Sequence, residues 1–401
     1  MVELAAGDAQ KRRGALIVFE GLDRSGKSTQ AQKINEKLNK KGIKSEYCSF
    51  PDRSPETRTG PTIQKHLEEA GSPLDKKEEI HLIFSQNRWE RIGKLEEKLQ
   101  NGTTIILDRY VASGASYTMA KGLPKSFACA VDVGLPRPDY VVYLDVSHEV
   151  ITKRKGFGDE KFEVPKFQAD VRKAMEEFRE HSTWKTINAD QSMEAVENDV
   201  EKLVFDLVEA DRPEQLDVIE PGYFGAARKD EDFEPKDFPM DVATRGLLLA
   251  FQGPDAKVRA EETGEEEFAE GCKTQLGLSE VHGPTGVTDD LTPREKALQA
   301  AAHFWNQHEN VLKHLAEGSI VVLLNYVPSL IQETNNNVAD KTWAEALSYG
   351  LPVPDKSVDW QSIEDLDELI KRKEDFNKDC ARLLEHREDL LGTVKRYVPK
   401  K

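Results

Sequence analysis

The chain has 401 residues, a formal net charge of −17, 38% hydrophobic residues and 32% charged residues. This length suits two ordinary domains with apolar cores, and it excludes a miniprotein or a disordered acidic chain. A negative surface repels nucleic-acid backbones and anionic membranes, so we expect neither as a partner. Neither a signal-peptide pattern nor a run of about 18 apolar residues is present, which predicts a cytoplasmic protein and leaves the nucleus open.

Three short apolar runs in the first half are separated by long helical patterns. They are Ala15 to Phe19, Thr104 to Leu107 and Tyr140 to Leu144. This alternation predicts an α/β fold with a parallel sheet that helices bury on both faces. The glycine turn from Gly21 to Thr29 follows the first run and leads into an amphipathic helix.

The glycine turn contains the pattern G-x-x-x-x-G-K-[ST], which is a P-loop placed between a strand and a helix. In such a loop, backbone N–H groups surround phosphate oxygens, the lysine reaches the β and γ phosphates, and the hydroxyl ligates Mg²⁺. The motif therefore predicts an ATP site made by Gly21, Asp23, Arg24, Ser25, Gly26, Lys27, Ser28 and Thr29.

The region from Gly14 to Leu207 resembles thymidylate kinases of the eukaryotic type. Five segments carry the resemblance: Phe19 to Gln30, Phe50 to Ser54, Leu82 to Glu90, Asp108 to Gly114 and Gly134 to Asp139. The resemblance implies a nucleoside monophosphate kinase fold and an enzyme that phosphorylates dTMP to dTDP with Mg·ATP, a step of dTTP biosynthesis.

The chemistry of such a transfer explains why cations recur. The second pKa of a phosphate monoester is about 6, so the acceptor oxygen is already ionised and needs no strong base. Repulsion between two polyanions is the obstacle, and positively charged groups remove it. The available cations are Lys27, Arg24, Arg53, Arg109 and the basic run Lys153 to Lys155, which includes Arg154.

The resemblance also implies roles for individual residues near the phosphates. Arg53 and Arg109 would hold the acceptor phosphate, and Asp23 would bond the sugar 3′-hydroxyl. Arg24 would move toward the transferring phosphoryl group. Asp108, together with Ser28, would hold Mg²⁺ or its waters.

For the thymine pocket, the resemblance implies a ring that stacks on the base and a guanidinium that bonds its carbonyl edge. Phe84 and Arg88 would supply them from one helix face. Tyr117 would crowd the 2′ side of the sugar. The substrate site is completed by Phe50, Ser113, Gly114, Phe162 and Gln168. Phe162 stands where relatives often have tyrosine, and Lys161 where they often have arginine, so the lid contacts depart from the pattern.

The second half repeats parts of the first. Gly14 to Asp23 matches Gly246 to Asp255, and the numbering offset is 246 − 14 = 232. Asn101 to Tyr110 matches Glu317 to Tyr326 with an offset of 317 − 101 = 216, and Gly134 to Asp139 matches Gly350 to Asp355 with the same offset. Two separate matches at one offset predict a tandem duplication.

The second copy has lost the residues that carry chemistry. Val258, Arg259 and Ala260 replace Gly26, Lys27 and Ser28, and Phe304 replaces Arg88. Leu324 and Asn325 replace Asp108 and Arg109. A β-branched residue cannot easily adopt the glycine's backbone conformation, and the Mg²⁺ hydroxyl is gone. We therefore predict a degenerate copy with a structural or regulatory role.

The predicted domain organisation is an active thymidylate-kinase-like domain over 11–212, a proline-rich acidic linker over 213–244 and the degenerate copy over 245–401. Because relatives are typically homodimers, we expect either an intramolecular pseudo-dimer or a homodimer through the first copies. Two other functions stay open: a kinase for another nucleoside monophosphate, and a non-catalytic assembly protein that senses nucleotides.

Overall fold

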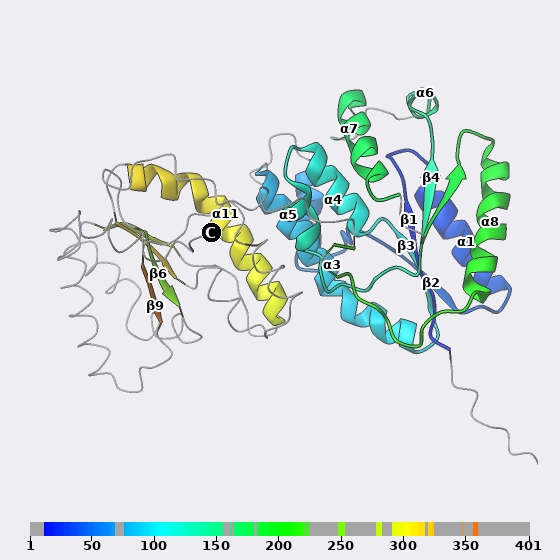
Figure 1. Ribbon diagram of the computed structural model, residues 1–401, viewed down its shortest axis with the longest axis horizontal. Coiled ribbons are helices and arrows are strands. Elements are labelled where there is room, and N and C mark those ends of the chain that lie inside the picture. Colours follow the sequence, from blue (N-terminus) through cyan, green and yellow to red (C-terminus); the bar gives the residue numbers. More distant parts are fainter. Residues whose placement is uncertain are drawn as a thin grey trace, which may run out of the picture. The chain divides into compact units, whose positions relative to one another are not determined.

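The computed structural model describes residues 12–68, 76–154, 162, 164–179, 183–220, 222–223, 248–252, 278–282, 291–316, 320–324, 347 and 356–359. The chain forms two compact units, the first reaching Asp232 and the second beginning at Phe233 (Figure 1). Each unit contains its own parallel sheet.

The first unit is built on a five-stranded sheet in the order β2-β3-β1-β4-β5, with every neighbouring pair parallel. The three apolar runs of the sequence form its central strands, which confirms the predicted α/β parallel sheet. The edge strands carry no continuous apolar run, because one flank of an edge strand has no sheet neighbour. The strands are β1 (Leu16–Glu20), β2 (Ser45–Ser49), β3 (Thr104–Asp108), β4 (Tyr140–Asp145) and β5 (Trp184–Asn188).

Helices cross over between these parallel strands and cover both faces of the sheet. Helices α1 and α8 lie on one side, and α3, α4 and α5 lie on the other (Figure 1). The helices are α1 (Lys27–Lys40), α2 (Gly60–Glu68), α3 (Lys77–Gln100), α4 (Val111–Ala120), α5 (Lys125–Ala130), α6 (His148–Ile151), α7 (Pro165–Glu176) and α8 (Met193–Glu209).

The core of the first unit lies between the sheet and these helices. All side chains of β1 and β3 are buried, and α1 buries the predicted stripe of Ala31, Ile34 and Leu38. One residue of β1 is polar: Glu20 is fully buried at the carboxyl end of the strand. Since the carboxyl ends of parallel strands meet at one edge of the sheet, the loops after β1 and β3 lie side by side there.

The beginning of the predicted linker packs on the first unit. Ile219 is buried, and it exchanges backbone hydrogen bonds with the 134–135 turn: Gly134 N–H donates to the Ile219 carbonyl and Ile219 N–H to the Leu135 carbonyl, both at 2.8 Å. An ion pair joins Arg137 to Asp217 nearby. Residues 224–244 of the predicted linker lie outside the described residues, so the linker boundary stays a prediction.

The second unit contains a four-stranded parallel sheet in the order β7-β8-β6-β9. Its strands are β6 (Leu248–Gln252), β7 (Leu278–His282), β8 (Ile320–Leu324) and β9 (Lys356–Asp359). Helix α11 (Pro293–Ala316) precedes β8. A capping box starts this helix, because Thr292 and Glu295 bond each other's backbone N–H groups at 3.3 and 2.8 Å.

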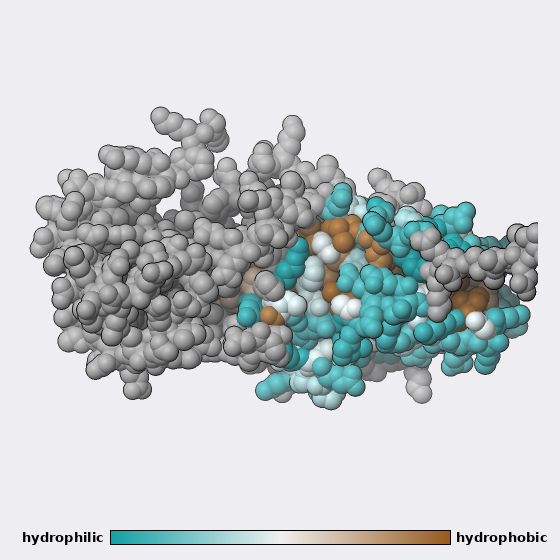
Figure 2. Space-filling view, turned by 90° about the horizontal axis from the view of Figure 1, so that it is seen from below, coloured by the Kyte–Doolittle hydropathy of each residue, from teal (hydrophilic) through white to brown (hydrophobic). Residues whose placement is uncertain are grey.

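The surface of the described residues is mainly hydrophilic, with small apolar patches on the face seen in Figure 2. Val164, Met193 and Val218 are the exposed large apolar residues among those described. In the same part of the chain, no helix combines the length and hydropathy needed to cross a membrane.

Candidate active site

The P-loop runs from β1 into α1, as its sequence pattern predicts. Gly26 caps α1 with φ of 98°, a left-handed conformation that suits glycine. Lys27 is buried directly after it, and its Nζ donates to the Leu22 carbonyl at 2.8 Å. Burial, reinforced by the charge of Arg109, lowers the pKa of Lys27 to about 8. A phosphate group would replace the carbonyl as the partner of this lysine.

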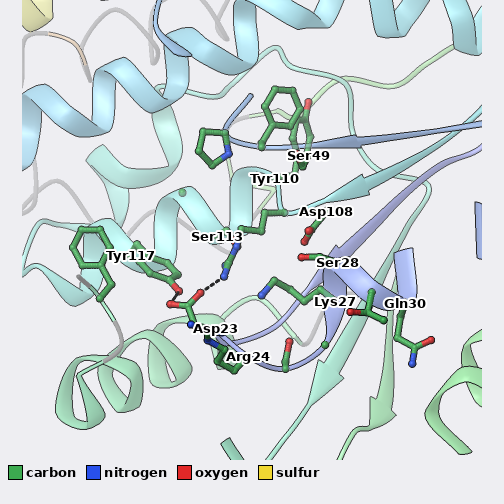
Figure 3. Close-up of a pocket in the computed structure, with 18 of the residues that line it drawn as sticks. Asp23, Arg24, Lys27, Ser28, Gln30, Ser49, Asp108, Tyr110, Ser113 and Tyr117 are labelled. Carbon is green, nitrogen blue, oxygen red and sulfur yellow. Dashed lines mark hydrogen bonds and ion pairs between the residues drawn. The ribbon is translucent and has the colours of Figure 1, made fainter. Parts of the chain in front are cut away.

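A cavity of about 1010 Å³ opens beside the P-loop at the carboxyl ends of β1 and β3 (Figure 3). Almost all of the predicted site residues line it, including residues that lie far apart in the sequence. They are Asp23, Arg24, Ser25, Gly26, Lys27, Ser28, Thr29, Phe50, Arg53, Phe84, Arg88, Asp108, Arg109, Ser113, Gly114, Tyr117, Arg154 and Phe162.

Asp23 is the centre of a charged cluster in the middle of this cavity (Figure 3). It forms an ion pair with Arg109 and accepts hydrogen bonds from Tyr117 Oη at 2.6 Å and Gln168 Nε2 at 2.7 Å. Burial alone would raise the pKa of Asp23, but Arg109, Lys27 and these hydrogen bonds outweigh it and lower the pKa. Asp23 is therefore ionised, and it fixes the positions of both Arg109 and Tyr117.

The loop that carries Arg109 is held by the buried Glu20. Its carboxylate accepts from the backbone N–H groups of Tyr110 and Ser113, at 3.0 and 3.1 Å, and from the Ser113 hydroxyl. Burial raises the pKa of Glu20 although these hydrogen bonds oppose the shift. Arg109 itself has φ of 68°, a strained conformation for a side chain of this size. Strain of this kind persists where surrounding contacts impose it, as Glu20 does here.

Asp108 and Ser28 lie on the same side of the cavity (Figure 3). Asp108 Oδ2 accepts a hydrogen bond from Tyr47 Oη at 3.3 Å, whereas its buried Oδ1 makes no hydrogen bond to the described residues. A buried carboxylate oxygen beside an exposed hydroxyl is a donor set that Mg²⁺ prefers. These residues therefore fit the predicted metal site.

Phe84 and Arg88 from α3 also line the cavity. Arg88 is 3% exposed and forms a two-point ion pair with Asp132, with Nε to Oδ1 at 3.0 Å and Nη2 to Oδ2 at 2.6 Å. Its guanidinium packs on Gly114, where a Cβ atom would lie 2.9 Å from Nη1. A larger residue at position 114 would displace the arginine.

Two predicted site residues do not line the cavity. Gly21 lies behind the loop, where a Cβ atom would be 2.8 Å from the Leu144 carbonyl. Gln168 is buried behind Asp23 and supports it, as described above. In the lid region, Arg154 bonds the carbonyls of Arg24 and Ala189. Residues 155–161, which include Lys161, lie outside the described residues.

Sequence reasoning missed several cavity residues. Tyr47, His81, Lys121, Met193 and Val196 also line the cavity. His81 is buried between the Thr118 hydroxyl, at 2.7 Å, and the Ala128 carbonyl, at 3.1 Å. Burial holds its pKa well below the ordinary value, so the ring is neutral. A histidine three positions before Phe84 on the same helix is the signal that could have identified it.

Comparison with known proteins identifies a family model and relatives that match the first half of the chain. Residues 19–200 match a family model described as thymidylate kinase. A thymidylate kinase from Arabidopsis thaliana is 48% identical over 198 residues, which cover 49% of this chain and 73% of that protein. A thymidylate kinase from Caenorhabditis elegans is 40% identical over 220 residues, which cover 52% of this chain and 98% of that protein. A solved thymidylate kinase from Candida albicans has 34% identity and a TM-score of 0.45, covering 52% of this chain and 98% of its own.

Proposed function

The chain belongs to the thymidylate kinase family and is thus a phosphotransferase, and from that premise we propose that it transfers the γ-phosphoryl group of ATP to dTMP. The matched region, residues 19–200, lies within the first unit. The relatives named above support dTMP as the acceptor. The product would be dTDP, which places the reaction in dTTP biosynthesis.

One observation carries the proposal: a single cavity is lined both by the P-loop and by the Phe84 and Arg88 pair. The ion pair of Arg109 and Asp23 lines the same cavity. A donor triphosphate on the P-loop and an acceptor base against Phe84 would thus bring their phosphates together beside Arg109. This geometry suits direct, in-line transfer between two bound nucleotides.

The residues of the chain would act by charge neutralisation and positioning. Lys27 would bond the β and γ phosphates, while Arg109 and Arg53 would bind the acceptor phosphate. Arg24 would contact the transferring group. Asp23 would orient Arg109 and bond the 3′-hydroxyl of the sugar, and Tyr117 would exclude a 2′-hydroxyl.

Mg²⁺ supplies charge neutralisation between the phosphate oxygens when it is bound. Asp108 Oδ1 and Ser28 Oγ would hold it or its waters, because they are the hydroxyl and the buried carboxylate oxygen that face the P-loop end of the cavity. No general base is required, since the acceptor phosphate is ionised at neutral pH.

The experiment that tests this function is ADP release by the full chain with Mg·ATP against dTMP, dUMP, UMP, CMP, AMP and GMP. We expect strong preference for dTMP, and a Lys27→Ala chain serves as the blank. Preference for another acceptor would show that the base pocket has been misinterpreted. Turnover of none of them would favour a nucleotide-sensing role.

We further propose that the second unit is a degenerate copy of the first. Two features support this. The strand order β7-β8-β6-β9 corresponds to β2-β3-β1-β4, and the pairs Leu248 with Val321 and Leu16 with Ile105 occupy equivalent positions. Helices α3 and α11 each have 24 residues, and their first residues are separated by the offset of the later repeat matches, 293 − 77 = 216. Such a copy would act as a scaffold or regulator without chemistry of its own.

The pseudo-dimer also stays a proposal, and the mass of the full chain in solution tests it. A monomeric particle with full activity is expected if the second unit replaces a partner subunit. A strictly dimeric particle, with the second unit outside the dimer interface, would reject the pseudo-dimer in favour of a homodimer through the first units.

A further inference from the structure

We propose that Asp132 is a positioning residue for nucleobase selection, because it fixes the one guanidinium at the base end of the described cavity. The inference rests on the proposed function, since it concerns how that site selects its acceptor. Asp132 is fully buried in the turn after α5 and does not line the cavity, whereas Arg88 does. Asp132 therefore does not contact a ligand in this cavity directly, and Arg88 is the lining residue to which it is hydrogen-bonded.

The geometry leaves one edge of the Arg88 guanidinium for the ligand. Asp132 engages Nε and Nη2 and makes no hydrogen bond to Nη1, while a Cβ atom at Gly114 would lie 2.9 Å from Nη1 and 3.0 Å from Nη2. A guanidinium has donors only, and a fixed one discriminates a ring carbonyl, which accepts, from a ring amino group, which donates. A mobile guanidinium would lose this selectivity because it could turn away from the amino group.

Asp132 is itself held in place from α3. Ser85 Oγ donates to its Oδ1 at 2.7 Å. The same helix face reaches the neighbouring Val131 carbonyl through Ser85 Oγ and Trp89 Nε1, at 3.2 and 3.4 Å. A role confined to tying α3 to this turn is the competing explanation, and the experiment must separate the two.

A second buried ion pair of the first unit provides the comparison. Arg13 and Asp139 form two bonds at 2.8 and 2.7 Å, are similarly buried, and do not line the cavity. At the offsets of the internal repeat, this pair corresponds to Arg245 and Asp355, whereas Arg88 and Asp132 correspond to Phe304 and Ser348. The second half of the sequence, which has lost the site motifs, thus retains an arginine and an aspartate at the positions of Arg13 and Asp139. It has neither residue type at the positions of Arg88 and Asp132. That difference favours a functional reason for the Asp132 pair.

The test compares Asp132→Asn with Asp139→Asn in the full chain. Both variants are expected to lower the melting temperature, since each disturbs a buried ion pair. Only Asp132→Asn should raise KM for dTMP, by roughly tenfold, with kcat changed less than about threefold. Its preference for dTMP over dCMP should also fall by roughly tenfold, and KM for ATP should stay constant. Unchanged KM and preference, or equal changes in Asp139→Asn, would overturn the proposal.

One further variant covers the case in which Asp132→Asn does not fold, and a double variant tests whether Asp132 acts through Arg88. Ser85→Ala removes one hydrogen bond to Asp132 and should shift the preference in the same direction by roughly twofold to fivefold. In an Arg88→Met chain, adding Asp132→Asn should not change the preference further, because Asp132 acts only through Arg88. A further loss in the double variant, or no shift in Ser85→Ala, would contradict the inference.

Equilibrium binding of dTMP and dCMP without ATP separates this inference from the proposed function. If the wild-type chain prefers dTMP in binding but does not phosphorylate it, the proposed function fails while the variants still decide the role of Asp132. If the wild-type chain phosphorylates dTMP but does not discriminate against dCMP, the function stands and the inference fails.

Discussion

The sheets of the two units share an order of four strands, yet the residues that follow strands at the same place in that order differ. In the first unit, β3 ends at Asp108 and leads into Arg109, whereas β8 ends at Leu324 and is followed by Asn325. Formation of a parallel sheet requires apolar runs, and the sequences of both β3 and β8 supply one. The charges that follow β3 are not needed for a parallel sheet, so they need an explanation other than the fold.

The helices before these strands show the same contrast in their buried positions. His81, Ser85 and Arg88 are buried polar residues of α3, and the α11 residues that follow them by 216 positions are the buried Ala297, Ala301 and Phe304. Replacing buried polar groups with apolar ones is often neutral or stabilising. The polar residues of α3 are therefore explained by the cavity that they line or support rather than by the stability of the helix.

The largest expected effect comes from removing the P-loop lysine. Lys27→Ala in the full chain should lower dTMP turnover at least roughly 10²-fold, the scale for one preorganised electrostatic contact. The matched change Arg259→Ala in the second unit should leave turnover unchanged. Initial rates of ADP release measure both. Substantial residual activity in Lys27→Ala that disappears on adding Arg259→Ala would show that the second unit catalyses the reaction.

The next largest effect is expected from replacing Arg109, which follows β3, with asparagine, the residue type that follows β8 in the second unit. Arg109→Asn should reduce kcat on the order of 10²-fold, because a cation between the two phosphates is lost. It also leaves the buried Asp23 without its ionic partner, which should lower the free energy of unfolding by about 1 to 3 kcal/mol. Kinetics and urea unfolding measure these effects. Near-normal turnover in a folded variant would remove Arg109 from the phosphate site.

A smaller effect is expected from pH, because the pKa of Lys27 is about 8 in the free protein. Lys27 is charged below this value and neutral above it. The kcat/KM for ATP should thus be level at lower pH and fall roughly tenfold for each pH unit above the pKa. A Lys27→Arg chain keeps its charge and should show no alkaline fall, whatever its rate. An identical fall in both chains would assign the titration to another group.

The smallest effect concerns the capping box of the second unit. Thr292→Ala removes the hydroxyl that caps α11 and should lower the stability of this unit by about 1 kcal/mol. Turnover of dTMP at a temperature where both units are folded should not change. Denaturant unfolding and initial rates measure the two outcomes. A loss of turnover without unfolding would give the second unit a role beyond that of a scaffold.

The sequence allowed most of the P-loop end of the site to be predicted. The segment from Gly21 to Thr29 is contiguous, and its spacing alone implies a phosphate-binding loop. Asp108 and Arg109 follow an apolar run, so their place at the carboxyl edge of the sheet could also be expected. Arg88 and Phe84 could be assigned to the cavity because they are four residues apart on a helix and match a family motif.

The supporting residues could not be found in this way. Glu20 looks like an ordinary end of a strand, and its role depends on Tyr110 and Ser113, which lie in a distant part of the sequence. Asp132 lies in a turn with no local motif, and only the packing of α3 on that turn brings it to Arg88. Gln168 does not line the described cavity but donates to Asp23, which does, so its predicted contact with the substrate stays a prediction. Contacts between distant segments decide these roles.

The close approach of Gly114 to Arg88 has a consequence for how this pocket can change. A side chain at position 114 collides with the guanidinium, while loss of the guanidinium opens space beside a glycine. A single substitution at either position is therefore expected to disturb the packing of the pocket. Only simultaneous substitutions at both positions would restore it. A change of base preference through single substitutions would pass through such a poorly packed variant. Laboratory evolution of the enzyme should therefore vary positions 88 and 114 together.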